Sequence, residues 1–207
     1  MESEQVQSRP RGRPRSFDRD EVLDAAVLVF WEKGYRGASV DDLTEAMGIK
    51  RPSLYAAFGS KRDLFFAAID RYAATHGRRS FDPLRLDPDT REGVERFFEA
   101  HIRCATEKDM PRGCLIACVA TDEAENGAAL RKKLSHMFSR TDAAIASRFR
   151  ASQEDGSFPA EHDPGELARM VHSVSHSIRV RARAGAKRHE LDEIAASFMA
   201  VLFPSPK

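Results

Sequence analysis

The groups best suited to bind another molecule are two cations and a hydroxyl at the predicted start of a short helix. Lys50, Arg51 and Ser53 flank Pro52, which suits the first helical turn because its missing N–H costs nothing there. A helix N-terminus attracts anions, and an arginine can donate two hydrogen bonds to one guanine edge. These residues therefore predict non-covalent recognition of a nucleic acid. An ordinary helical hairpin with a solvated basic end is the alternative.

A second basic cluster lies near the N-terminus. Arg9, Arg11, Arg13 and Arg15 fall within a stretch of seven residues, RPRGRPR, that contains no acid. The stretch resembles an AT-hook, in which proline keeps the chain extended and arginines enter the narrow minor groove of A·T-rich DNA. We expect residues 1–16 to form a disordered arm, with Arg11, Arg13 and Arg15 contacting DNA. A solubilising basic tail is the other interpretation.

Two short helices and the turn between them are predicted to position Lys50 and Arg51. Ser39 and Asp42 have capping-box spacing and begin a helix that stops at Gly48. A second helix follows at once and ends at Gly59. This is the pattern of a helix-turn-helix, in which the second helix enters the DNA major groove while the first crosses the phosphate backbone.

The order of residues between Phe17 and Tyr72 is more specific than the helix-turn-helix spacing. It includes Ala25, Phe30, Gly34, Tyr35, Ser39, Val40, Leu43, Ala46, Gly48, Ser53, Leu54, Tyr55, Phe58, Lys61 and Leu64. With these residues the segment resembles the N-terminal domain of the TetR family of transcriptional regulators. The resemblance implies a homodimeric, all-helical repressor in which Tyr55 and Lys61 contact phosphates and residues 50–56 face the bases.

The predicted DNA contacts of this domain are Ser39, Lys50, Arg51, Pro52, Ser53, Tyr55, Ala56 and Lys61. One position departs from the family. Many members carry histidine or another large residue immediately before the phenylalanine, where this chain has Ala57. We therefore expect no phosphate contact from that side chain.

Hydrophobic periodicity predicts an all-α chain throughout. The expected units are a disordered basic arm at 1–16, the helix-turn-helix domain at 17–77, and a helical effector-binding and dimerisation domain at 78–207. A segment rich in Pro and Asp, 80–89, is expected to be a linker loop. Two further apolar helices are predicted at 166–184 and 190–203, and the resemblance implies that this pair forms a four-helix dimer interface.

Cysteine and histidine offer alternatives to an organic effector. His101 and Cys104 are three residues apart, and Cys114 and Cys118 are four apart, which is a possible Cys₃His set for zinc or a thiolate set for Cu(I). A metal- or thiol-redox-sensing regulator of the same fold is thus the first alternative. A thiol enzyme is a weaker one, because no local signature supports it. No Gly-rich phosphate loop, GxSxG or HExxH occurs, so we predict no enzyme, no cofactor and no metal.

The preferred interpretation is an unknown small-molecule effector held in an apolar cavity with a few polar groups. The residues predicted to line that cavity are Phe97, Phe98, His101, Cys118, Met137, Phe138, Met170 and His172. Periodicity alone leaves open that all eight are ordinary core residues.

Overall charge limits the nucleic-acid footprint to a local one. The 207 residues carry 33 Lys and Arg against 32 Asp and Glu, a net charge of +1. No apolar run approaches the length of a membrane span, so we expect a cytoplasmic protein without membrane partners. The predicted function is a ligand-responsive regulator, in the form of a repressor released from a palindromic double-stranded DNA operator. An effector-blind architectural DNA-binding protein is the rival of another class.

Overall fold

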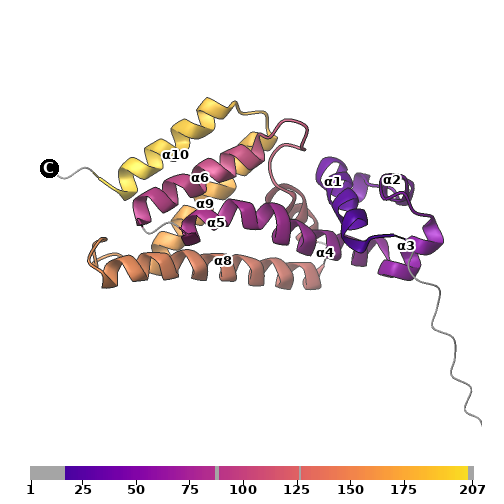
Figure 1. Ribbon diagram of the computed structural model, residues 1–207, viewed down its shortest axis with the longest axis horizontal. Coiled ribbons are helices and arrows are strands. Elements are labelled where there is room, and N and C mark those ends of the chain that lie inside the picture. Colours follow the sequence, from indigo (N-terminus) through magenta and orange to yellow (C-terminus); the bar gives the residue numbers. More distant parts are fainter. Residues whose placement is uncertain (1–16, 87–88, 126, 205–207) are drawn as a thin grey trace, which may run out of the picture.

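The computed structural model describes residues 17–86, 89–125 and 127–204, and within these ranges the chain is helical and has no strand (Figure 1). The all-α prediction is thereby confirmed. The arm at residues 1–16, with Arg11, Arg13 and Arg15, lies outside the described residues. Figure 1 shows a small helical unit at one end, which α4 joins to a longer helical bundle.

The small unit consists of α1 (Arg19–Gly37), α2 (Val40–Ala46), α3 (Arg51–Phe58) and α4 (Lys61–Tyr72). Its core is aromatic: the ring of Phe30 lies 5.0 Å from that of Phe65, and Trp31 lies 5.1 Å from Tyr72. Leu54 of α3 is fully buried against this core. The short α3 is therefore held by packing, since an isolated helix of this length is not stable in water.

Local sequence determines where these helices begin and end. Asp18 caps α1, and Ser39 and Asp42 form the predicted capping box of α2. Gly48 has a φ of +61°, a left-handed conformation that favours glycine and turns the chain between α2 and α3. In α1, Gly34 forms a kink with φ of +74°, after which one more turn continues to Gly37.

The prediction of a linker loop at 80–89 is wrong for residues 80–86, which are helical, whereas residues 87 and 88 lie outside the described ranges. The helix α4 continues through a π-helical turn, η1 (Ala73–Gly77), into α5 (Arg78–Leu86), so the expected domain boundary at 77/78 falls within continuous helix. Pro83 lies inside α5, and a proline inside a helix costs about 3 kcal/mol. Packing offsets that cost, because Leu84 is buried and the Phe81 ring lies 5.2 Å from that of Phe97.

The larger unit is built from α5 and the helices that follow it. They are α6 (Thr90–Ala105), the π-helical η2 (Ile116–Ala120), α7 (Thr121–Ala124), α8 (Ala128–Glu154), α9 (Pro164–Arg183) and α10 (Arg188–Leu202). The π-helical η2 leads directly into α7. Phe97, Phe149 and Ile178 are fully buried where α6, α8 and α9 meet. No helix in the described ranges is long and apolar enough to cross a membrane.

The two units are not separated by a flexible joint. A single hydrophobic core extends from α1 and α4 through Leu115 and Val119 to Leu130 and Leu134 at the start of α8. The side chain of Arg36 also donates to Glu123 over 2.9 Å, and Glu123 is only 8% exposed. Because close-packed interiors transmit displacements, a shift in the larger unit reaches α1 and α4.

Candidate nucleic-acid interface

The exposed end of α3 carries most of the predicted DNA contacts on one surface. Leu54 and Phe58 fix the inner face of the helix, and Pro52 lies in its first turn. On the outer side, Lys50, Arg51, Pro52, Tyr55 and Ala56 are exposed, while Ser53 is half-buried. An exposed helix with cations at its N-terminal end is the geometry that places side chains against base edges in a major groove.

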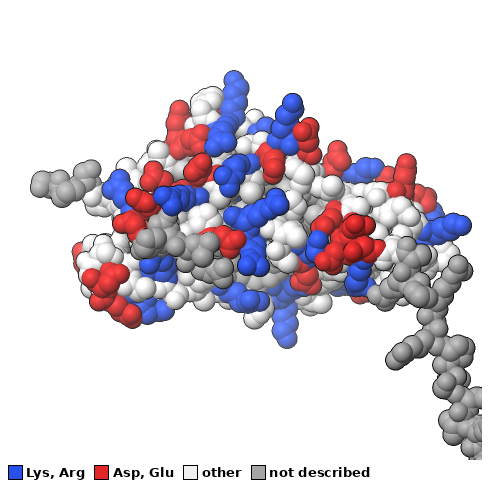
Figure 2. All heavy atoms as spheres, in the orientation of Figure 1, with Lys and Arg blue, Asp and Glu red and all other residues white. Residues whose placement is uncertain are grey.

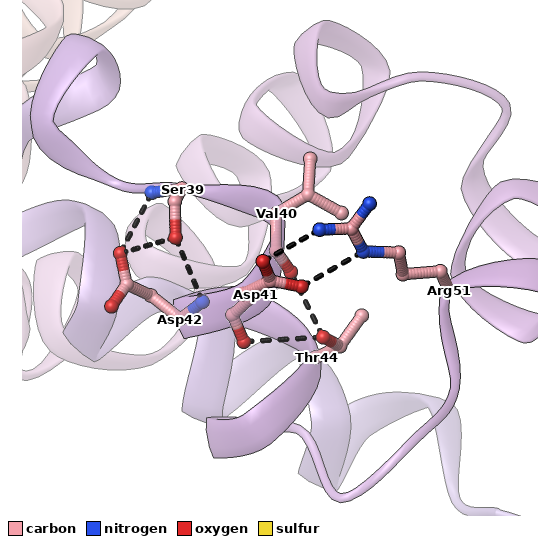
Figure 3. Close-up of polar contacts among 6 residues, drawn as sticks. All are labelled: Ser39, Val40, Asp41, Asp42, Thr44 and Arg51. Atoms are coloured by element: carbon pink, nitrogen blue, oxygen red, sulfur yellow. Dashed lines mark hydrogen bonds and ion pairs between the residues drawn. The ribbon is translucent and has the colours of Figure 1, made fainter.

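Arg51 does not extend freely into solvent. Its Nε donates to Asp41 Oδ1 over 2.8 Å and its Nη2 donates to Asp41 Oδ2 over 2.6 Å (Figure 3). The contact joins the first turn of α2 to the first turn of α3. Sequence analysis placed Arg51 at the tip correctly but missed Asp41, which lies ten residues earlier and has no distinguishing local pattern.

Ser39 serves the structure of α2. Its Oγ accepts from the Asp42 backbone N–H over 3.0 Å and donates to Asp42 Oδ2 over 2.7 Å (Figure 3). Lys33 donates to the other Asp42 oxygen over 2.6 Å. Hydrogen bonds from Lys33 and Ser39 hold the pKa of Asp42 well below its usual range. This network fixes where α2 begins.

Lys61 and Arg19 supply further cations near α3. Lys61 begins α4, and its Nζ lies 4.7 Å from the centroid of the Tyr35 ring; burial of the side chain lowers its pKa. Arg19 Nη1 donates to the Ala57 carbonyl over 3.1 Å, and its guanidinium lies 4.5 Å from the Phe58 ring centroid. Arg19 therefore places a cation beside the position at which Ala57 offers none. Sequence analysis did not identify it.

Charge on the face that Figure 2 presents is mixed. On the face that Figure 2 presents, Lys and Arg side chains are interspersed with Asp and Glu over both units. This agrees with a net charge of +1. Any electrostatic attraction to DNA therefore has to come from a local surface.

The structure does not bring the eight predicted effector residues together. Phe97, Phe98 and His101 are buried in the core of the larger unit, and Phe138 lies against the rings of His172 and His176. Met170 lines a surface groove with Phe198, and Cys118 lies beside a different hollow at the end of α1. Met137 alone of the eight lines the cavity described next.

A cavity of about 620 Å³ lies between the continuous helical segment η1–α5 and the helix α8. Its wall includes Ala73 of η1, Phe81 and Leu84 of α5, and Met137 of α8. The charged side chains along it are Arg78, Asp82, Arg140 and Arg148. Sequence analysis missed the α5 contribution because it treated that segment as a loop.

Burial lowers the pKa of three histidines in the larger unit. Burial lowers the pKa of His101 well below its usual value and that of His176 to about 3. Burial also lowers the pKa of His172, although Asp142 Oδ1 lies 2.6 Å from its Nδ1 and acts in the opposite direction. A neutral imidazole serves as a hydrogen-bonding group, not as a fixed charge.

The three cysteines are free thiols. Cys118 Sγ donates to the Arg179 carbonyl over 3.7 Å, and burial raises its pKa. Across the described ranges no three His, Cys, Asp or Glu side chains are grouped so as to hold a metal ion. The proposed set of His101, Cys104, Cys114 and Cys118 is therefore not assembled as a metal site.

Comparisons with known proteins agree with this geometry. Residues 22–68 match the family described as bacterial regulatory proteins, tetR family, and residues 91–198 match the tetracyclin repressor-like C-terminal domain. The HTH-type transcriptional repressor ComR of Escherichia coli is 32% identical over 200 residues, which span 95% of this chain and 94% of that protein.

Two solved structures extend the comparison. A cysteine mutant of the regulator CifR, complexed with 26 bp double-strand operator DNA, is 39% identical with a TM-score of 0.83, over 93% of this chain and 100% of that one. A regulator from Chloroflexus aurantiacus is 22% identical with a TM-score of 0.80, over 90% of this chain and 94% of that one, which is a likeness of fold.

Proposed function

Because the chain belongs to the TetR family of bacterial transcriptional regulators, we propose that it is a homodimeric repressor released from its operator by a small organic anion. Double-stranded DNA and the second copy of the chain are its macromolecular partners. The family consists of regulators of transcription, and no catalytic step is part of the proposal.

The exposed tip of α3 supports operator binding. Arg51 and Tyr55 face outward from a helix that Leu54 anchors in the core, and Lys61 lies at the start of the next helix. Two copies of the chain would present two α3 helices to half-sites about one DNA turn, ~34 Å, apart. The likeness to CifR, which was solved in complex with operator DNA, supports operator binding.

The observation that carries the effector half of the proposal is the cavity between α5 and α8. Its volume, about 620 Å³, falls within the range of small-molecule sites. Three of its charged side chains are arginines and one is an aspartate, beside several apolar groups. Arg78 Nε lies 3.8 Å from Asp82 Oδ1, which offsets one of these positive charges. Arg140 adds a positive charge to the same wall, and this charge favours a ligand with an apolar body and an anionic group, such as a medium-chain carboxylate.

The position of the cavity supports coupling to DNA binding. Ala73 lies in its wall and belongs to η1, which continues α4 without a break. Since only two residues separate the end of α3 from the start of α4, a ligand that moves η1 relative to α8 would tilt α4 and displace α3. In a dimer, that displacement changes the distance between the two recognition helices, so the ligand selects a form that no longer matches both half-sites.

An operator-release assay tests this proposal. Fluorescence anisotropy would measure the affinity for a selected operator with and without octanoate, using octanol as the uncharged analogue. We expect octanoate to weaken operator binding by about tenfold or more and octanol to have little effect. Arg140→Gln should abolish the response.

Arg150→Gln is the matched control, because Arg150 lies on α8 but not in the cavity wall. It should respond to octanoate as the wild type does. Equal effects of octanoate and octanol, or an unchanged response in Arg140→Gln, would contradict an anionic effector in this cavity. An operator affinity that responds to no ligand would favour the effector-blind architectural role. The presence of the cavity argues against that role.

A further inference from the structure

The contact between Arg51 and Asp41 contributes little to the stability of the fold. The Arg51 side chain is 58% exposed and that of Asp41 is 70% exposed, and exposed ion pairs are screened by water and salt. Its geometry is nevertheless well defined, because two parallel hydrogen bonds of 2.8 and 2.6 Å fix the plane of the guanidinium. The contact therefore restricts orientation more than it adds stability.

The geometry of the Arg51 guanidinium determines which of its N–H donors remain available to a DNA base. The group has five N–H donors in one plane, and the contact uses the Nε–H and one Nη2–H. Both Nη1–H bonds and the second Nη2–H remain, and together they form the fork at the outer end of the side chain. That fork matches the O6 and N7 acceptors of guanine in the major groove.

Asp41 is itself held in place. It lies in the first turn of α2, two residues after the Ser39 cap, and Thr44 Oγ1 donates to the Asp41 carbonyl over 3.1 Å (Figure 3). The carboxylate that orients Arg51 thus stands on a fixed backbone, which is what a positioning group requires.

The charge of Asp41 is a further observation. A carboxylate beside the base-reading end of α3 repels DNA phosphates and so opposes binding to any sequence. It also offsets the unspecific attraction that Arg51 has for phosphate. A negative charge at this place reduces affinity for all DNA, and it raises the ratio of specific to non-specific binding if it improves the contact with one base.

We propose that Asp41 is a positioning residue that holds Arg51 with its outer fork toward a guanine, so that preference for a G·C pair in each half-site belongs to the Asp41–Arg51 pair. This inference rests on the proposed operator binding. Asp41 lowers the loss of side-chain freedom when Arg51 binds, because the guanidinium is ordered before DNA arrives.

The test is a comparison of discrimination at single base pairs. Operators selected with the wild-type protein would be changed one base pair at a time, and anisotropy at one salt concentration would give the affinity of each. Arg51→Ala should identify the pair that Arg51 reads. At that pair, Asp41→Asn should reduce the preference for G·C about 3- to 10-fold and leave the preferences at other pairs unchanged.

Two further variants separate positioning from charge. Glu45→Gln removes one negative charge from an exposed position on the same helix that does not contact Arg51. It should strengthen binding to scrambled DNA about as much as Asp41→Asn does, with no change in preference. Adding Asp41→Asn to Arg51→Ala should cause no further loss of discrimination, because Asp41 acts only through Arg51.

Identical effects of Asp41→Asn and Glu45→Gln on every DNA would overturn the inference and leave Asp41 as a surface charge. A gain in G·C preference in Asp41→Asn would also overturn it, since Asp41 would then withhold Arg51 from the base. Wild-type protein that binds selected and scrambled DNA equally would contradict the proposed operator binding itself, a result that is distinct from either of these.

Discussion

Lys61 and Arg51 both place a positive charge near the end of α3, yet their surroundings predict different roles. Arg51 is exposed and oriented by a carboxylate, whereas Lys61 has its stem half-buried and its Nζ 4.7 Å from the Tyr35 ring centroid. An ammonium is a point charge without a planar fork, and contacts to phosphate carry no sequence information. We therefore predict that Lys61 binds phosphate and that Arg51 reads a base.

Replacement of Lys61 by glutamine is predicted to lower the affinity for operator DNA and for scrambled DNA by the same factor. Each phosphate neutralised contributes about 0.9 to the slope of log K against log salt, so the slope should fall by about that amount. A salt titration by anisotropy measures it. Lys132→Gln, a change at an exposed position on α8, should leave the slope unchanged. A loss confined to one operator sequence would instead make Lys61 a base contact.

Cys118 is predicted to be a poorly reactive thiol. Burial raises its pKa, so the thiolate that reacts with alkylating agents is scarcer at neutral pH than in an ordinary cysteine. Mass spectrometry should find alkylation of Cys118 by iodoacetamide at pH 7.5 roughly tenfold slower in the folded protein than in urea. Equal rates would favour the redox-sensing alternative.

Metal sensing is tested by elemental analysis of protein purified without chelator. One zinc or copper ion per chain would favour it.

At the scale of helices, the contact between α1 and α4 is held by a charge cluster around Arg71. Its Nε and Nη2 donate to the two Asp24 oxygens, both over 2.7 Å, and its Nη1 donates to Asp20 over 2.6 Å. The hydrogen bonds from Arg71 lower the pKa of Asp24. A carboxyl with a lowered pKa stabilises the folded state above its unfolded pKa, and this stabilisation is lost as pH falls through the folded pKa.

Arg71→Gln should therefore destabilise the protein by about 1 kcal/mol at pH 7, a modest figure because Asp24 is 48% exposed and solvent screens the pair. The difference from wild type should shrink as pH falls below about 4, where Asp24 becomes protonated in the unfolded chain. Urea unfolding at pH 7 and pH 3 measures both values. Arg103→Gln, at an exposed position on α6, serves as the control. A difference that persists at pH 3 would assign the effect to packing of the Arg71 stem.

The helices also show what the sequence could and could not predict. Ser39, Asp42 and Gly48 specify α2 and its turn through local hydrogen bonds and a left-handed φ, and local patterns are visible in a sequence. The helix α5 was missed because Pro83 argues against it locally, whereas the packing of Phe81 against Phe97 of the next helix, which stabilises it, is not visible in the local sequence. Periodicity likewise identified Phe97 as facing inward without telling filled core from cavity, and so the cavity wall was not predicted.

For the whole molecule, the apolar surface of α9 and α10 points to the dimer. Met170 is 48% exposed and Val180 is 50% exposed on α9, and Val201 is 74% exposed on α10. A groove between these helices is lined by Met170, Val174 and Phe198. Exposed apolar side chains that line a common groove mark interaction surfaces, and a two-fold axis through this one would pair it with itself. Operator binding by two α3 helices requires such a pairing.

Met170→Glu is accordingly predicted to yield a monomer at micromolar concentration, because two copies would bring like charges into an interface that excludes water. Analytical ultracentrifugation measures the mass, and anisotropy should show the operator affinity falling toward that for scrambled DNA, since each monomer meets one half-site only.

Leu28→Glu is the matched control: Leu28 is 40% exposed but lies on α1 in the small unit, so this variant should remain dimeric. The melting temperature of the wild type should rise with protein concentration, as mass action requires of a dimer, and that of Met170→Glu should not. A Met170→Glu protein that sediments as a dimer would exclude the α9–α10 surface as the interface, and the two recognition helices would then have to be paired through another face.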